Sequence, residues 1–282
     1  MTAGEWSSTA LGLVTMMRLG NCLMAAAGAL LGALICLGAG DASEYFDEIA
    51  LSMLVVFLFT AAGNSMNDYF DRDVDCRAHP ERPIPRSLVR PRDALMFAVL
   101  LFSLSVLLGL VIGAVSFVIV VASLAVMVSY EVILKQEGLA GNLAISWLTG
   151  ALFLFGGAAV ENLDLAWILA ILAFLATLGR EIIKDVQDIE ADLKERTTLP
   201  MRIGEKNAGV ASSAALLTAV ALSPAPYLLG QISAFYLPIV AVADAIFIFS
   251  SIIHFKNPER GQRMTKLAMF VALCAFLAGG VP

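Results

Sequence analysis

Hydrophobic residues occur along this chain in nine long runs that are separated by short polar segments. Each run has about 20 residues, the length that an α-helix needs to cross the hydrocarbon core of a bilayer. The pattern therefore predicts nine membrane-spanning helices, at residues 18–39, 47–68, 93–112, 114–134, 142–160, 164–184, 208–228, 232–253 and 264–281. These spans leave no room for a soluble second domain, so we expect residues 1–282 to form a single domain, with 1–17 as a short interfacial helix or a tail.

Composition agrees with this interpretation. Hydrophobic residues make up 59% of the chain and charged residues only 15%, which indicates an all-α integral membrane protein. The net charge of -6 does not indicate a nucleic-acid partner, because the basic residues belong to the loops between the spans. The expected partner is the lipid bilayer, and the sequence does not set the oligomeric state.

The lysines and arginines predict the orientation. They lie near the start of the first span and in the loops after spans 2, 4, 6 and 8, whereas the opposite loops carry acidic residues and neither Lys nor Arg. Because basic loops stay in the cytoplasm, the N-terminus is expected to be cytoplasmic and the C-terminus external. The predicted location is the plasma membrane, with several passes.

Two acidic segments end spans 2 and 6. On a helix, the members of each set project within about 60° of one another. The first set is Asn64, Asp68, Asp71 and Asp75, and the second is Glu181, Asp185, Asp188 and Asp192. Since both follow even-numbered spans, we expect them to face one cytoplasmic cavity.

Carboxylates this close repel one another unless a cation lies among them. Ligands that are all oxygen favour a hard cation such as Mg²⁺, which commonly bridges carboxylates to phosphate oxygens. The pattern thus predicts a metal-bridged diphosphate, with excess negative charge offset by nearby cations. The basic residues placed for this are Arg72, Lys135, Arg180 and Lys184. A metal that stabilises a diphosphate leaving group promotes cleavage of its C–O bond.

At these motifs the chain resembles the UbiA superfamily of intramembrane prenyltransferases. Residues 67–75, Asn-Asp-Tyr-Phe-Asp-Arg-Asp-Val-Asp, resemble the family's N-D-x-x-D-x-x-x-D motif, and residues 185–192, Asp-Val-Gln-Asp-Ile-Glu-Ala-Asp, resemble its D-x-x-D-x-x-x-D motif. The Arg-Pro-Ile-Pro run at 82–85 and the pairs Arg18 with Asn21 and Tyr130 with Lys135 also resemble family positions.

The resemblance implies nine helices around a central apolar cavity, with a polar cytoplasmic cap that holds two Mg²⁺. The implied metal ligands are Asp68, Asp71, Asp75, Asp185, Asp188 and Asp192, of which Asp68, Asp71, Asp185 and Asp188 form the catalytic core. The residues implied to bind diphosphate or substrate are Arg18, Asn21, Asn64, Asn67, Arg72, Arg82, Tyr130, Lys135, Arg180 and Lys184.

The implied activity is transfer of a prenyl group from a prenyl diphosphate to a lipophilic acceptor. The archaeal branch is the most similar, which implies transfer from geranylgeranyl diphosphate to geranylgeranylglyceryl phosphate, forming the second ether bond of archaeal lipids. One alternative is an aromatic or quinone-precursor acceptor. Another is a cation-binding transporter, which is disfavoured because the acidic residues lie at helix ends and not at mid-bilayer.

Four other features are interpreted from the sequence. Asp244 lies well inside span 8, where it either pairs with a polar neighbour or has a function. Gly156-Gly157 indicates close helix packing, and Gly138, Gly141 and Asn142 indicate a turn into span 5. Asp73 projects away from the acidic face and is expected to be solvated or salt-bridged. Spans 3, 4 and 5, which carry few polar residues, are expected to line the apolar cavity.

Overall fold

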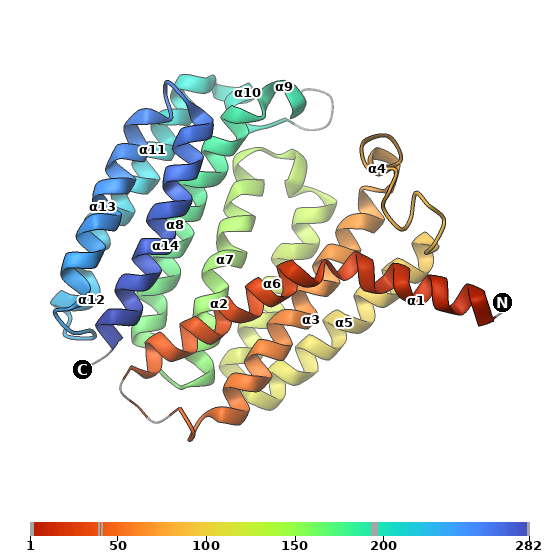
Figure 1. Ribbon diagram of the computed structural model, residues 1–282, viewed down its shortest axis with the longest axis horizontal. Coiled ribbons are helices and arrows are strands. Elements are labelled where there is room, and N and C mark those ends of the chain that lie inside the picture. The colour runs from red at the N-terminus through yellow and green to blue at the C-terminus, as the bar shows by residue number, and fades with distance from the viewer. Residues whose placement is uncertain (1–2, 39, 41, 193–196, 281–282) are drawn as a thin grey trace. The chain divides into compact units, whose positions relative to one another are not determined.

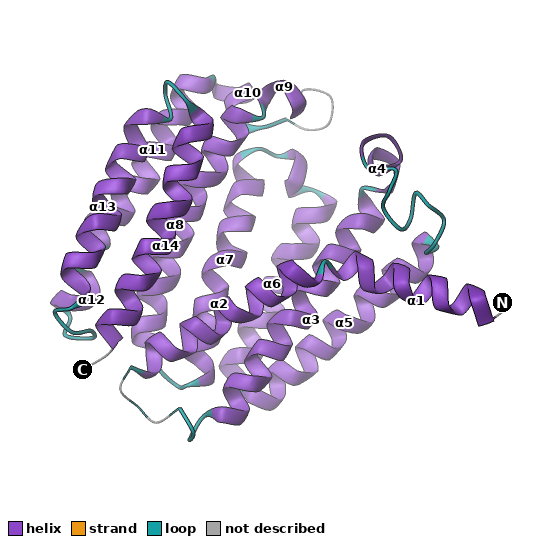
Figure 2. Ribbon diagram, viewed as in Figure 1, coloured by secondary structure: helices purple, strands orange, loops and turns teal. Residues whose placement is uncertain are grey.

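The computed structural model describes the chain except residues 1–2, 39, 41, 193–196 and 281–282. The regular secondary structure of the described part is helical, as Figure 2 shows. One isolated bridge joins Glu137 and Thr197. The side chain of Asp192 lies outside the described part, so its predicted role as a metal ligand stays a prediction.

Nine helices in the described chain are long and apolar enough to cross a membrane, which confirms the number of spans predicted. Eight of them are single helices: α2 (Leu19–Leu37), α3 (Phe46–Phe70), α5 (Pro91–Ile112), α6 (Ala114–Val132), α7 (Leu139–Ala159), α8 (Leu163–Gln187), α13 (Tyr236–Ile253) and α14 (Pro258–Gly280). The remaining span joins α11 (Glu205–Leu222) to α12 (Ala225–Leu228).

Short helices flank these spans: α1 (Ala3–Met17), α4 (Arg72–Ala78), α9 (Ile189–Asp192) and α10 (Leu199–Ile203), with a 3₁₀ turn, η1, at Leu134–Gln136. Residues 3–17 are therefore a helix, one of the two states expected for the N-terminal segment. The predicted start of the last span at residue 264 is wrong, because α14 begins at Pro258. Its first two turns are polar, so hydropathy marks only the apolar part of this helix.

The turn predicted before span 5 from Gly138, Gly141 and Asn142 is confirmed at Gly138, but the predicted start of the span at Asn142 is wrong, because α7 begins at Leu139. The turn before α7 is at Gly138, which has a φ of 58°, and Asn142 is buried one turn inside the helix. A positive φ suits glycine because it has no Cβ. The glycines therefore mark the turn correctly, but α7 begins before Asn142, the polar residue at which the span was expected to start.

Contacts divide the chain into two compact units. Unit 1 comprises residues 1–30 and 46–132, and α3 packs there against α5 and α6 (Figure 1). Its core is built from small and medium side chains that let helices approach closely: Cys22, Ala61, Ala62, Met66, Ala98, Leu101 and Phe102. The single domain expected over residues 1–282 stays a prediction.

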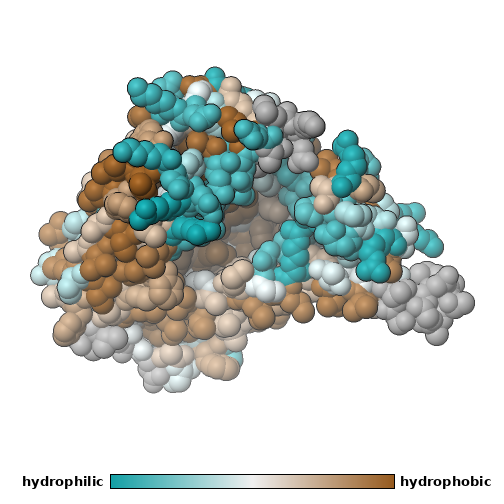
Figure 3. Space-filling view, turned by 45° about the horizontal axis from the view of Figure 1, so that its top comes forward, coloured by the Kyte–Doolittle hydropathy of each residue, from teal (hydrophilic) through white to brown (hydrophobic). Residues whose placement is uncertain are grey.

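Unit 2 comprises residues 31–45 and 133–282, and α8 packs there against α7, α11 and α14. A Cβ placed on Gly157 of α7 would collide with the Cβ of Ala166 on α8. This confirms that Gly157 serves helix packing. Figure 3 shows hydrophobic residues along the flank of this unit and hydrophilic residues gathered at one end, as expected for helices that cross a bilayer.

Candidate active site

The first acidic motif lies where α3 ends and α4 begins. The backbone bends at Asp71, which has φ -85° and ψ 2°. The helical hydrogen bonds continue through the bend, because the N–H of Asp71 donates to Asn67 O at 2.9 Å and the N–H of Asp75 donates to Asp71 O at 2.8 Å. This sparsely populated backbone region is one where many active-site residues are found.

The second acidic motif has the same local geometry. Asp188 ends α8 with φ -98° and ψ 10°, its N–H donates to Lys184 O at 2.9 Å, and α9 begins at the next residue. The prediction of one continuous helix through each motif is therefore wrong. Each helix bends at the second aspartate, a residue type whose side chain competes for backbone hydrogen bonds and weakens helix interiors.

Two arginines hold the buried carboxylates of the first motif. An Nη atom of Arg18 lies 2.5 Å from Asp68 Oδ1, and Nη1 of Arg82 lies 2.6 Å from Asp75 Oδ2 and 3.6 Å from Asp68 Oδ1. The side chains of Asp68 and Asp75 are each only 4% exposed. Carboxylates buried this deeply need partners, and the two guanidinium groups supply both charge and N–H donors.

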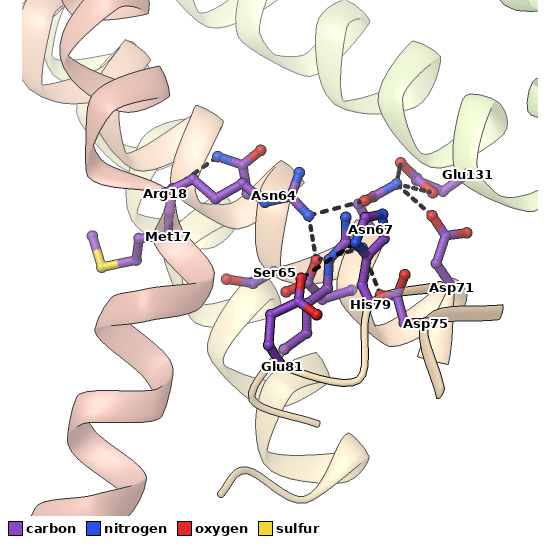
Figure 4. A network of polar contacts seen from close by, with 12 residues as sticks. Met17, Arg18, Asn64, Ser65, Asn67, Asp71, Asp75, His79, Glu81 and Glu131 are labelled. Carbon is purple, nitrogen blue, oxygen red and sulfur yellow. Dashed lines mark hydrogen bonds and ion pairs between the residues drawn. The ribbon is translucent and has the colours of Figure 1, made fainter. Parts of the chain in front are cut away.

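Arg18 reaches Asp68 because of a break between two helices. Its φ of 51° separates α1 from α2, and Asn64 Nδ2 donates a 2.8 Å hydrogen bond to Met17 O (Figure 4). A left-handed backbone is uncommon for a residue other than glycine and is maintained by its surroundings. Asn64 thus fixes the junction that carries Arg18, rather than joining the carboxylates itself.

The loop after α4 places Arg82. Its apolar residues Ile84 and Val89 are buried against Met16 of α1 and Ala94 of α5. Three prolines, Pro80, Pro83 and Pro85, stiffen this loop. Packing on both sides gives the loop a fixed position, from which Arg82 extends to the carboxylates.

Asn67 links the arginine to two further carboxylates. Its Oδ1 accepts from Arg18 at 3.4 Å, while its Nδ2 donates at 3.1 Å to Asp71 Oδ2 and at 3.1 Å to Glu131 Oε1 (Figure 4). Glu131 is buried near the end of α6 and was not predicted as a site residue. The sequence feature that could have identified Glu131 is its position directly after Tyr130, at the end of an apolar run.

An asparagine holds the first aspartate of the second motif. Asn142 Nδ2 on α7 donates a 2.8 Å hydrogen bond to Asp185 Oδ2 on α8, and both side chains are buried. Ser146 Oγ donates to Asn142 O at 2.6 Å. Sequence reasoning missed Asn142, because it interpreted this residue as part of a turn.

The remaining polar residues near the second motif are half-buried. They are Arg180, Lys184 and Asp188. Arg180 forms an ion pair with Glu181, its neighbour in the chain. Unit 2 therefore presents, at the end of α8, two carboxylates of the motif together with two basic side chains.

A family model described as "UbiA prenyltransferase family" matches residues 24–274. The chain belongs to the UbiA prenyltransferase family. The assignment confirms the resemblance in the motifs, and with the nine spans it confirms a multi-pass membrane protein and a prenyltransferase. Membership of a prenyltransferase family also decides against the alternative that this protein is a cation-binding transporter.

Relatives match this UbiA prenyltransferase over nearly its full length. A digeranylgeranylglyceryl phosphate synthase from Methanosarcina mazei is 39% identical, covering 94% of this chain and 96% of the relative. One from Natronomonas pharaonis is 38% identical, covering 95% and 96%. A solved structure described as "Structural and mechanistic insights into the biosynthesis of Digeranylgeranylglyceryl phosphate synthase in membranes" has a TM-score of 0.89 at 31% identity and covers 97% of this chain and 99% of that one.

A more distant structure has the same fold. It is a UbiA homologue from Archaeoglobus fulgidus, described as bound to GPP and Mg²⁺, with a TM-score of 0.70, 16% identity, and coverage of 95% of this chain and 98% of its own. The comparison confirms the fold class that the nine hydrophobic runs predict.

The structure also describes other predicted site residues of this UbiA prenyltransferase. Asn21 is exposed on α2. Arg72 turns back on Tyr69, donating to its carbonyl at 2.8 Å and stacking over its ring at 5.0 Å. Asp73 is 85% exposed and lies 4.0 Å from Arg72, in agreement with the prediction of a solvated or salt-bridged residue. Lys135 is half-buried in η1.

The donor set of the two motifs fits a hard cation by chemistry, because it consists of carboxylate and amide oxygens. In the part of the chain that the structure describes, however, no three His, Cys, Asp or Glu side chains lie close enough together to hold a metal ion. Arg18 and Arg82 occupy the carboxylates of Asp68 and Asp75. These contacts use Asp68 Oδ1 and Asp75 Oδ2, and each carboxylate has a second oxygen through which a cation could be bound.

Proposed function

We propose that this protein transfers a geranylgeranyl group from geranylgeranyl diphosphate to geranylgeranylglyceryl phosphate, forming the second ether bond of archaeal membrane lipids. The near full-length similarity to digeranylgeranylglyceryl phosphate synthases at 38–39% identity carries this proposal. The two acidic motifs support it, because each presents buried carboxylates whose side-chain hydrogen bonds fix their orientation.

Two Mg²⁺ are proposed to serve the reaction, held by Asp68, Asp71, Asp75, Asp185, Asp188 and Asp192. When bound, such ions neutralise charge on the departing diphosphate. A distant homologue described as bound to GPP and Mg²⁺ supports a divalent cofactor. The arginines that now hold Asp68 and Asp75 would be released toward the incoming phosphate oxygens, which bind a guanidinium fork well.

The other polar residues are proposed to bind and orient the substrates. They are Arg18, Asn21, Asn64, Asn67, Arg72, Arg82, Tyr130, Lys135, Arg180 and Lys184. Asn64 acts by holding the α1–α2 junction through Met17 O, and Asn67 acts by bridging Arg18 to Asp71. A phosphorylated acceptor needs cations of its own, which Arg18, Arg82 or Lys135 would supply.

The proposed chemistry is an alkyl transfer that begins with ionisation. The C–O bond of the donor breaks, diphosphate leaves with the electron pair, and a delocalised allylic cation remains. The glycerol hydroxyl oxygen of the acceptor attacks that carbon, and its proton is lost as the ether forms. Basic side chains stabilise the leaving group, and the surrounding apolar residues exclude the water that would otherwise trap the cation.

The proposed location is the plasma membrane. The N-terminus and both acidic motifs would lie in the cytoplasm and the C-terminus outside, because Lys and Arg are confined to alternate loops.

One assay tests this proposal. The purified protein, reconstituted in lipid nanodiscs, is given labelled geranylgeranyl diphosphate, Mg²⁺ and an equimolar mixture of geranylgeranylglyceryl phosphate and 4-hydroxybenzoate. We expect one Mg²⁺-dependent product whose mass corresponds to the glyceryl phosphate acceptor carrying a second geranylgeranyl chain. Prenylation of 4-hydroxybenzoate alone would overturn the ether-lipid proposal and favour the aromatic acceptor, while leaving the prenyltransferase assignment intact.

A further inference from the structure

Unit 2 contains an apolar cavity of about 270 Å³ within its membrane-spanning part. Residues of α7, α8, α11, α13 and α14 form its walls, and α8, α13 and α14 can be followed in Figure 1. The lining is almost entirely aliphatic and aromatic, and it includes Phe153, Leu172, Phe247 and Phe276. Among these apolar side chains the cavity has one carboxyl group, that of Asp244.

The hydrogen-bonding capacity of the Asp244 carboxyl group is only partly used. It lies halfway along the 18-residue α13, and its Oδ2 accepts a 2.7 Å hydrogen bond from Ser223 Oγ. Tyr236 Oη donates to Ser223 O at 2.7 Å, which fixes the position of this serine. No other residue in the described chain hydrogen-bonds to Asp244, so its Oδ1 retains full acceptor capacity on a cavity wall. A polar side chain at this depth in a membrane indicates a functional site.

The cavity is separate from the second acidic motif. Its lining residue on α8 nearest to that motif is Ala176. Asp185 lies nine residues further along α8, which corresponds to about 14 Å along the axis and about 180° around it. A ligand in the cavity would therefore not displace anything bound to Asp185.

The lining and the volume define the ligand. A dry cavity of about 150 Å³ accommodates benzene, so about 270 Å³ corresponds to roughly eleven carbon atoms. An anionic head group is disfavoured, because no basic side chain lines the walls and Asp244 is itself acidic. The free acceptor oxygen requires one hydrogen-bond donor, and a hydroxyl loses less hydration than an ammonium group on entering an apolar site.

Access is available from the side of the unit. Phe270 of α14 lines the cavity and is itself 65% exposed. A small apolar molecule can therefore enter beside this ring from the surrounding hydrocarbon without crossing a polar layer.

We propose that this cavity binds a neutral apolar alcohol of about ten carbons, whose hydroxyl group donates a hydrogen bond to Asp244. The alcohol is either a branched isoprenoid or a linear chain. This site uses none of the residues of the proposed transfer reaction, so it does not depend on that proposal.

Photo-crosslinking of the full chain in nanodiscs tests the site. The probe is a diazirine analogue of geraniol, and the competitors are geraniol, 1-decanol and 2,6-dimethyloctane, compared at equal mole fraction in the lipid. We expect saturable labelling of α8 and α13 that an alcohol suppresses about ten times more effectively than the hydrocarbon, since only the alcohol can pair with Asp244. The stronger of the two alcohols identifies the branched or the linear class.

Three variants sharpen the test. Asp244→Leu removes the acceptor and should weaken labelling about tenfold, whereas Asp244→Asn keeps an acceptor oxygen and should stay within about threefold. Ala173→Phe fills the cavity from α8 and should abolish labelling. Thermal unfolding of each variant reports folding independently of transfer activity.

Equal competition by the hydrocarbon and the alcohols, or undiminished labelling of a folded Asp244→Leu variant, would overturn the proposal. If Asp244→Leu fails to fold, the comparison of alcohols with hydrocarbon on the unaltered protein still decides it.

Discussion

Buried aspartates in this protein depend on nitrogen donors that lie far away in the sequence. Arg18 and Arg82 hold Asp68, and Asn142 holds Asp185 across 43 residues. A carboxylate at this depth loses its hydration. The hydrogen-bond donors around it therefore decide its orientation and how much free energy its burial costs. At the residue scale, the donors therefore matter to the proposed chemistry as much as the carboxylates do.

Replacement of Asn142 tests this dependence. Asn142→Leu removes the donor to Asp185 and keeps a similar volume, so we expect kcat/KM for transfer to fall by about 10- to 100-fold and the half-saturating Mg²⁺ concentration to rise. Steady-state kinetics over a Mg²⁺ series measures both. Asn207→Leu is the matched control, because Asn207 is exposed and donates a hydrogen bond to Ile203 O, four residues before it. Equal kinetics for the two variants would show that Asp185 needs no such donor.

The sequence predicts the aspartates but not all of their partners, and the reason is physical. Helical spacing places residues of one segment on one face, so the acidic sets can be recognised locally. Glu131 and Asn142 meet the motifs through packing of different helices, which leaves no local pattern. Arg18 was recognised from a family resemblance, but its left-handed backbone and the support from Asn64 required the structure.

At the scale of the helix, hydropathy gives the number of spans but misses bends and polar ends. The helix breaks at Asp71 and Asp188 are changes in the φ and ψ angles of one residue, which a hydropathy pattern does not register. The polar first turns of α14, which begins at Pro258, are missed because hydropathy marks only the apolar part of that helix. Each bend lies at the second aspartate of a motif, so the first and third aspartates come from two different helical segments. Close packing, in contrast, is indicated by glycine in the sequence and is found at Gly157.

Helix packing at Gly157 is expected to be sensitive to added volume. In Gly157→Ala the new methyl group would collide with Ala166 Cβ and meet Asn162 O at 2.8 Å, so α7 and α8 must separate. We expect a loss of about 1–3 kcal/mol of stability, measured as a lower thermal midpoint in detergent.

Gly20→Ala is the matched control, because a Cβ at Gly20 meets no atom within 4 Å. Alanine there should leave stability unchanged or raise it by up to about 1 kcal/mol, its helix propensity being higher. Equal midpoints for the two variants would contradict the packing account.

At the scale of the whole molecule, the alternation of basic and acidic loops predicts the topology. We expect cysteines placed at Arg77 and Arg202 to react with a membrane-impermeant thiol reagent from the cytoplasmic side, and cysteines at Glu44 and Glu161 to react from the outside. Right-side-out and inside-out vesicles distinguish the two sides. Native Cys76 is exposed and must first be replaced by serine. Labelling of Arg77 and Arg202 positions from opposite sides would invalidate the predicted orientation.

The central proposal is that the aspartates of both acidic motifs are needed for Mg²⁺-dependent binding of the donor diphosphate. The most direct measurement is Mg²⁺-dependent binding of geranylgeranyl thiodiphosphate, a donor analogue that resists cleavage, to the reconstituted protein and its Asp68→Asn and Asp188→Asn variants. We predict that each single variant weakens binding at least about tenfold and that the double variant is weakened by less than the two effects combined, because residues that hold one ligand are energetically coupled. Wild-type affinity in either single variant, with folding intact, would contradict the account.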